Sequence, residues 1–242
     1  MNHYNQYELQ QQQEELASRS AFYLAKVMGW MCVGLFTTVV SAMLCLSVPG
    51  FWNFVFGSGI GFFGVLITQI VLVLALSARI HRMSSATATV MFMLYSAVTG
   101  LTMSSLIVAY RLDSLILSFG VTAVLFLAMS LYGLATRKDL SGWGNLLFFG
   151  LLGILAAGVI NMFLGSPMMD FLIVAVGIIL FIGLTAYDTQ KIKAIYQSAL
   201  AQGHDDEDDM VRKLAIFGAL TLYLDFINLF LHLLRLLGRR RN

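Results

Sequence analysis

Two aspartates lie inside long apolar stretches of this sequence, where a charged side chain is costly. Asp188 stands in the segment IGLTAYDTQKI and Asp225 in the segment LTLYLDFINLF. Of the thirteen acidic residues, only these two fall within segments apolar enough to cross a membrane. An ionised side chain at bilayer depth costs about 3 kcal/mol on insertion scales, so its presence marks a candidate functional site. Because carboxylates hold protons and bind cations, proton and cation chemistry is expected at Asp188 and Asp225.

The composition is that of a membrane protein. The chain is 59% hydrophobic and 12% charged, which leaves too little polar surface to cover a soluble globule of 242 residues. A helix needs about 20 apolar residues to cross a hydrocarbon core of about 30 Å. By this measure the sequence predicts an all-α integral membrane protein with seven transmembrane helices, at residues 22–46, 56–78, 88–110, 115–135, 146–164, 171–188 and 214–237.

Three parts of the chain follow from this pattern. Residues 1–20 are rich in Gln and Glu and lack the features of a secretory signal, which predicts a soluble N-terminal tail. Residues 21–238 form the transmembrane domain, and residues 239–242 form a basic C-terminal tail. The net charge is only +2 and dispersed, which argues against nucleic acid as a partner, and no Cys/His metal spacing is present. We expect no tightly bound cofactor.

The distribution of Lys and Arg predicts a cytoplasmic N-terminus. With that orientation only Arg111 lies in an outer loop, whereas the inner loops contain eight basic residues. The three arginines at 239–241 conflict with the rule, because seven spans place them outside. Either the last helix crosses or it is re-entrant, and its length favours crossing. The eight inner residues are Arg79, Arg82, Arg137, Lys138, Lys191, Lys193, Arg212 and Lys213.

The last apolar segment has one polar face. Lipid does not tolerate such a face, so it should point into the bundle or a water-filled cavity, which places this helix at or near the centre. Interhelical hydrogen bonds, worth about 0.6 kcal/mol each on average, explain the hydroxyl and amide groups but not the aspartate. We expect Thr221, Asn228 and His232 to line a pore. At about 100° per residue, an arc of about 80° contains Thr221, Asp225, Asn228, His232 and Arg235.

The two aspartates can meet. Taken alone, Asp188 can equally be an acid at the membrane surface that is balanced by Lys191 and Lys193. The helices that carry the two aspartates are consecutive and therefore antiparallel, which brings the end of one beside the start of the next. Asp225 lies eleven residues, or roughly 16 Å, into its run, so the match in depth is imperfect. If they meet, the two cannot both ionise freely, and the pair would act as a proton switch.

Four segments resemble one known family. They are GLTMSS at 100–105, LYGLATRKDLSGWG at 131–144, GLTAYDTQKIK at 183–193 and LTLYLDFINLFLHLLRL at 220–236. Together they are similar to the Bax inhibitor-1 family, and most closely to its bacterial members, over roughly residues 22–238.

The resemblance implies a seven-helix fold with the last helix surrounded by the other six. It implies a multi-pass protein of the bacterial inner membrane and a pH-sensitive calcium leak, gated by an aspartate pair that matches Asp188 and Asp225. It also implies a latch arginine at the cytoplasmic end of the second span, for which Arg82 is slightly favoured over Arg79. Because the second span has no acid, the two aspartates with Asn228 and water would bind Ca²⁺ only transiently, which is sufficient for a leak.

The leading hypothesis is therefore a passive cation channel that is sensitive to pH, with Ca²⁺ and protons as its small partners. A second class is an intramembrane aspartyl protease, but Leu222, Tyr223 and Leu224 stand where its GxG would precede Asp225, so we do not expect an enzyme. A third class is a membrane-embedded partner that modulates other membrane proteins, such as a membrane protease. The chain lacks the phosphate-binding loop of a primary pump.

Overall fold

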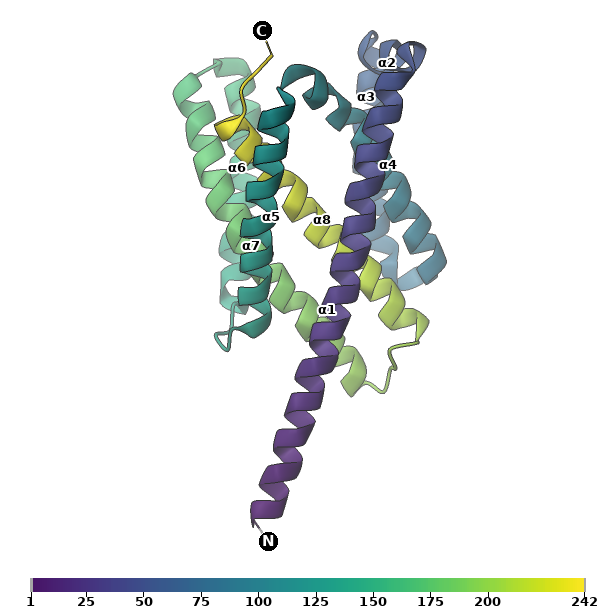
Figure 1. Ribbon diagram of the computed structural model, residues 1–242, viewed down its shortest axis with the longest axis vertical. Coiled ribbons are helices and arrows are strands. Elements are labelled where there is room, and N and C mark those ends of the chain that lie inside the picture. The colour runs from purple at the N-terminus through teal and green to yellow at the C-terminus, as the bar shows by residue number, and fades with distance from the viewer. Residues whose placement is uncertain (1, 242) are drawn as a thin grey trace.

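The computed structural model describes residues 2–241, which form an all-α bundle (Figure 1). Seven helices in this range are long and apolar enough to cross a membrane, as the sequence predicts. Between them lie the short helix α2 (Pro49–Phe56) and two single turns, η1 (Ile80–Arg82) and η2 (Ser141–Trp143). The seven long helices are α1 (Asn2–Ser47), α3 (Gly59–Arg79), α4 (Ser85–Ala109), α5 (Leu112–Ala135), α6 (Gly144–Leu164), α7 (Pro167–Ala201) and α8 (Asp209–Leu237).

Consecutive long helices run in opposite directions, so the connections gather at two ends (Figure 1). We call the lower end in Figure 1 the loop end; it holds residues 80–84, 136–143 and 202–208. We call the opposite end the tail end; it holds residues 48–58, 110–111 and 165–166 and the C-terminal tail, residues 238–241.

Side-chain caps set several helix starts. The Ser84 side chain accepts a hydrogen bond from the Thr87 backbone N–H at the start of α4, and Ser166 does the same for Met169 at the start of α7. Such caps satisfy backbone donors that have no partner within the first turn. Gly165 ends α6 with φ of 60°, a left-handed conformation that glycine adopts without strain.

Two helices extend well beyond the spans predicted from hydropathy. The α1 helix begins at Asn2, so the predicted tail at 1–20 continues the first span as a helix over its described part. The α7 helix runs to Ala201, 13 residues past Asp188. Neither extension contains Gly or Pro, and the Gln, Glu, Lys and Ala within them are good helix formers. Hydropathy therefore located the apolar part of each helix, not its ends.

The last helix is central, as predicted. Of the apolar stretch of α8, 61% is buried, whereas no other spanning helix exceeds 33%. Its main neighbours are α1, α4, α5 and α7. The α3 helix packs mainly against α4, and α6 mainly against α7, so these two lie outside the inner ring.

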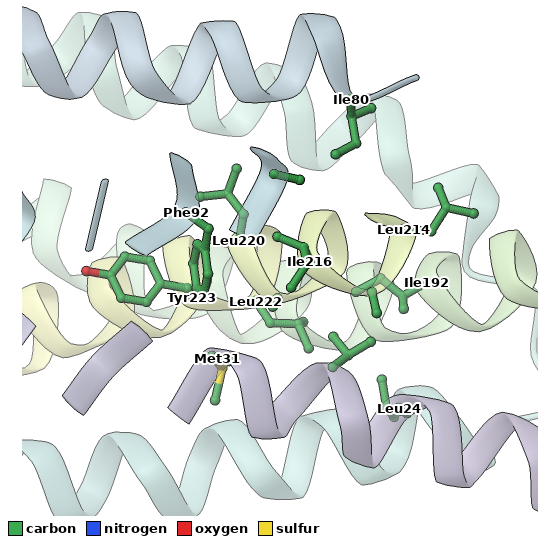
Figure 2. Close-up of a cluster of buried hydrophobic side chains, with 14 of the residues drawn as sticks. Leu24, Met31, Ile80, Phe92, Ile192, Leu214, Ile216, Leu220, Leu222 and Tyr223 are labelled. Atoms are coloured by element: carbon green, nitrogen blue, oxygen red, sulfur yellow. The ribbon is translucent and has the colours of Figure 1, made fainter. Parts of the chain in front are cut away.

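The core around α8 is mostly apolar with a few buried hydroxyls. Figure 2 shows side chains of α8, among them Leu220 and Leu222, directed toward α4 and toward α1. The Tyr223 ring meets Phe92 edge to face at 5.8 Å, and its hydroxyl is 2.7 Å from Thr38 Oγ1. Thr38 also donates toward the backbone oxygens of α1 and α4, so this buried polar group is fully used.

Candidate functional site

Asp188 of α7 and Asp225 of α8 lie against one another in the bundle. Their carboxyl groups are within hydrogen-bonding reach of each other, and the residues are only 9% and 5% exposed. The structure thus brings together the two aspartates that the sequence singles out. Like charges this close and this poorly hydrated repel strongly, so the two carboxyl groups cannot both ionise freely.

The length of α7 explains why the two aspartates meet. From Asp188 to Ala201 is 13 residues, or about 20 Å of helix, and from Asp209 to Asp225 is 16 residues, or about 24 Å. The two helices are antiparallel and joined by residues 202–208, so equal distances from the connection bring residues to equal depth. The poor match expected from the sequence arose because the sixth span was taken to end at Asp188.

Asp188 borders two hollows, whereas Asp225 borders neither of them. The smaller hollow has a volume of about 50 Å³, enough for a few water molecules, and is also lined by Tyr23, Gly218 and Thr221. The larger one, about 370 Å³, lies between α7 and the start of α6 near the loop end, where Asn145 lines it. In the pair, Asp188 therefore lies next to the two hollows, whereas Asp225 is enclosed by the bundle.

The cation that acts on Asp188 is Lys191, one turn further along α7. Lys191 lines both hollows, and its Nζ lies 5.8 Å from the centre of the Tyr187 ring. The predicted latch arginines, Arg79 and Arg82, line a separate hollow at the end of α3, and within residues 2–241 neither forms an ion pair with Asp188. Because α3 packs mainly on α4 and has no substantial contact with α7, an arginine latch requires α3 to move and stays a prediction.

The predicted polar face of α8 divides into two parts. Thr221 shares the small hollow with Asp188. Asn228 and His232 lie further toward the tail end, where His232 contacts Gly177 and the Phe181 ring of α7. All three bond to a backbone oxygen of their own helix, at 3.1, 2.8 and 2.8 Å. The structure therefore places Thr221 beside the aspartate pair, whereas pore lining by Asn228 and His232 stays a prediction.

Comparison with known proteins shows which family this chain belongs to. A family model described as "Inhibitor of apoptosis-promoting Bax1" matches residues 21–242. The chain belongs to the Bax inhibitor-1 family. The resemblance carried by the four sequence segments is thereby confirmed.

Several bacterial proteins are similar to this member of the Bax inhibitor-1 family over most of their length. Inner membrane protein YbhL of Escherichia coli strain K12 is 46% identical over 219 residues, which are 90% of this chain and 92% of the relative. An uncharacterized protein of Borreliella burgdorferi is 41% identical over 97% of this chain and 99% of its own. A membrane protein of Streptococcus pyogenes serotype M1 is 39% identical over 74% of each. With its seven apolar helices, this family member is a multi-pass membrane protein.

Sequence reasoning missed a buried row of hydroxyls in this member of the Bax inhibitor-1 family. Ser118, Thr122 and Ser130 are fully buried on α5, which packs against α7 and α8. Their spacing by multiples of four, which places them along one ridge of a helix, is a signal that the sequence does contain. A buried polar atom without a partner is uncommon and calls for an explanation. Within residues 2–241 such atoms are Ser96 Oγ, Ser118 Oγ, Ser130 Oγ, Thr189 Oγ1 and Asp225 Oδ2.

The chemistry available to the aspartate pair is proton exchange and weak cation binding. Residues 2–241 hold no group of three or more His, Cys, Asp or Glu suited to a metal ion. Calcium takes six to eight oxygen ligands, so the carboxylates of Asp188 and Asp225 supply only part of a site. An ion held there would exchange readily.

A second polar cluster fastens the loop end of the family member. Arg19 of α1 pairs with Asp206 at 3.0 Å, and the Tyr196 hydroxyl of α7 donates to the same carboxylate at 2.5 Å. Tyr196 also stacks on Tyr23 with ring centres 4.1 Å apart. The hydrogen bond from Tyr196 and, after it, the bond from Arg19 lower the pKa of Asp206 below its ordinary value. The cluster ties α1, α7 and the 202–208 connection together beside the smaller hollow.

We expect acid to release this cluster. A carboxylate whose pKa is lowered by folding stabilises the fold above its unfolded pKa of about 4, and this contribution is lost as the pH falls through its folded pKa. Because Arg19 and Asp206 are partly exposed, Asp206→Asn should lower the free energy of unfolding by only about 0.5 to 1 kcal/mol at pH 7. The difference from the parent should be full at pH 7 and should shrink as the pH falls below about 4 in SDS titrations, and Asp205→Asn is the matched control. A difference that is constant from pH 3 to pH 7 would contradict this assignment.

Proposed function

We propose that this protein is a pH-sensitive passive cation leak, with Ca²⁺ as the permeant ion, in which the protonation of Asp188 and Asp225 controls the gate. The observation that carries the proposal is the contact between two buried carboxylates on α7 and α8, the hairpin that includes the central helix. A change in the charge of this pair acts directly on the contact between those helices.

The electrostatic energy is of the size that a gate requires. Two unit charges 4 Å apart repel by about 4 kcal/mol at an effective dielectric constant of 20. Moving a two-state equilibrium from 1:99 to 99:1 takes about 5.5 kcal/mol. The gain or loss of one proton therefore supplies much of the energy for a transition between closed and open states. Lys191 and Tyr23 are the other titratable side chains that line the small hollow with Asp188, and Lys191 moderates the repulsion.

In this proposal the described conformation is the closed state, and the barrier lies in its tail-end half. An apolar cluster fills the space between α6, α7 and α8 there, with Phe181, Leu229 and Leu233 at its centre. Apolar constrictions of this kind gate channels by excluding water. In this proposal an ion reaches the Asp188 hollows from the loop end and passes the apolar cluster only when α7 and α8 separate.

The proposal includes an orientation. The loops and adjoining helix ends at the loop end carry eight Lys and Arg residues, whereas the loops between helices at the tail end carry only Arg111. This favours a cytoplasmic loop end and a cytoplasmic N-terminus by the positive-inside rule. The inner membrane is the proposed location, supported by the name of the Escherichia coli relative. The arginine latch at Arg82 or Arg79 would act in a conformation in which the end of α3 approaches Asp188.

Calcium flux into proteoliposomes tests the proposal. With the purified protein we expect flux that changes several-fold between pH 5.5 and 8. In Asp188→Asn and Asp225→Asn this pH dependence should flatten, because neither variant retains two ionisable carboxyl groups at the site. Asp170→Asn, which changes an exposed aspartate of the same helix, should keep the parent profile. The proposal fails if both site variants follow the parent at every pH.

A second candidate is a role as a modulator of another membrane protein, such as a membrane protease. One observation favours it: the first turns of α1 project beyond the bundle at the loop end, and residues 7–18 are exposed (Figure 1). A variant that lacks the residues before Arg19 would separate the two functions, because it removes the projecting turns and keeps the Arg19–Asp206 pair. If it keeps the flux but no longer co-purifies with a membrane protease that the parent binds, the projecting helix is a docking element. If the protein shows no flux above empty liposomes at any pH, the leak proposal fails and the modulator role is the remaining candidate.

A further inference from the structure

An apolar groove opens on the side of the bundle at the tail end. It has a volume of about 460 Å³, within the range of ligand sites, and it is lined by residues of α1, α4, α5 and α8. The α1 and α5 helices are not among the pairs in substantial contact, and α8 runs behind the space between them (Figure 1). Three lining side chains on its rim, Met43, Leu112 and Ile116, are 59%, 66% and 65% exposed. The groove therefore opens sideways, toward the hydrocarbon of a surrounding bilayer.

Arginines gather where this groove meets the tail end. Arg111 directly precedes Leu112 on the rim, and the C-terminal tail adds Arg239, Arg240 and Arg241, all exposed. The only described carboxylate that pairs with an arginine here is that of Asp113, which binds Arg111 at 3.0 Å. This end of the bundle thus presents a concentrated positive charge beside an apolar groove.

The arginine tail is held in place by the backbone. The Arg111 N–H donates to the Arg239 carbonyl at 3.1 Å, and the Arg241 N–H donates to the Ala109 carbonyl at 2.9 Å. The Arg239 N–H donates to Ser114 Oγ at 3.0 Å, and Gly238 lies so close to the Tyr110 ring that an added Cβ would come within 2.8 Å of it. The tail therefore forms part of the folded end of the bundle.

We propose that this end of the protein binds one anionic phospholipid, with its phosphate on Arg111 and the 239–241 arginines and an acyl chain in the groove. Arginine matches phosphate oxygens in geometry and charge, and an apolar groove open to hydrocarbon accepts an acyl chain. An anionic phospholipid has a phosphate at one end and acyl chains at the other. Along the bundle axis the arginines at the tail end come first and the apolar groove follows, so the two parts of the lipid match the two surfaces. The inference is independent of the proposed leak.

The site also gives the C-terminal arginines a role. In the orientation with a cytoplasmic N-terminus they lie at the end where the positive-inside rule does not expect them. A bound lipid phosphate would balance their charge.

Lipid retention measured by native mass spectrometry tests the inference. The detergent-purified full-length protein would be mixed with phosphatidylglycerol or with phosphatidylcholine of the same acyl chains, and we expect the anionic lipid to be retained preferentially. The combined variant R239Q/R240Q/R241Q should lower affinity for phosphatidylglycerol at least about ten-fold, because each arginine near an anionic lipid contributes roughly five-fold. The matched variant R137Q/K138Q/R212Q removes three exposed charges at the loop end and should keep the preference at the tail end.

A substitution inside the groove tests the acyl chain separately. Gly120 lines the groove, and a Cβ added there meets nothing within 4 Å, so Gly120→Leu starts a larger side chain in open space at the groove. It should weaken retention of both lipids while the thermal unfolding midpoint in lipid-free detergent does not fall, because leucine is a better helix former than glycine. Equal retention of the two lipids by the parent would overturn the inference. A preference that persists in R239Q/R240Q/R241Q, or that R137Q/K138Q/R212Q removes, would overturn it too.

Discussion

Asp225→Asn is expected to raise the free energy of unfolding by about 2 kcal/mol, even as it removes the pH dependence of flux. In the parent, Asp225 is buried with Oδ2 unpartnered and with a second carboxylate in reach. A buried polar group without a partner costs about 1 to 3 kcal/mol, and more when charged. An asparagine amide can donate a hydrogen bond to Asp188 at any pH, and it removes the repulsion between two ionised carboxylates.

SDS titration of the purified protein in a mild detergent at pH 7.5 measures this effect. Asp170→Asn is the control, since a substitution at an exposed site usually changes stability by less than about 0.5 kcal/mol. Functional sites often hold such unfavourable arrangements, so a gain in stability together with a loss of gating would mark the pair as functional. A loss of 1 kcal/mol or more in Asp225→Asn would show instead that the aspartate pair holds the fold together.

Gly133→Ala is expected to destabilise the bundle by about 1 to 3 kcal/mol. Gly133 of α5 faces the backbone of Ala186 on α7, and an added Cβ would lie against the Ala186 carbonyl group, with its carbon at 3.0 Å. A backbone cannot rotate away as a side chain can, so α5 and α7 must separate. Ala186 lies two residues before Asp188, and the displacement should therefore also change the pH profile of calcium flux.

The same substitution at Gly153 of α6 should have the opposite sign. A Cβ at Gly153 meets nothing within 4 Å, so Gly153→Ala gains up to about 1 kcal/mol of helix propensity without a clash. The free energy of unfolding of both variants can be measured by SDS titration. The comparison distinguishes the effect of a clash between helices from the general cost of a glycine within a helix. If both variants are stabilised, α5 and α7 do not approach as closely at Gly133 as the structure has it.

The number and order of the helices follow from the sequence because apolar runs of about 20 residues are a local property. The helix ends do not follow from it. Residues 189–201 and 2–20 are polar enough to lie in water, yet they contain no Gly or Pro and continue α7 and α1. Because the depth match of Asp188 and Asp225 depends on this extension, the sequence predicted that the two aspartates could meet, but only the structure explains how.

The surroundings of the pair were less predictable, since they depend on contacts between distant segments. The family resemblance suggests an arginine partner at Arg82 or Arg79, but the packing of α3 on α4 places both in another hollow. Lys191, which the sequence suggested as a balance for Asp188, is the cation that acts there. On the polar face of α8 Asp225 is buried, whereas Asn228 and His232 bond within their own helix. The hydroxyl row of α5 was visible in the spacing of its residues.

The extension of α7 connects the aspartate pair mechanically to the loop end of the bundle. Between Asp188 and Ala201 the helix is unbroken by Gly or Pro, and such a stretch tilts as a rod about 20 Å long. Its far end is fastened to α1 through the bonds of Arg19 and Tyr196 to Asp206. A protein that binds the projecting part of α1 can displace these bonds and so tilt the end of α7. That tilt would change the distance between the two carboxylates, although the bound protein contacts neither of them.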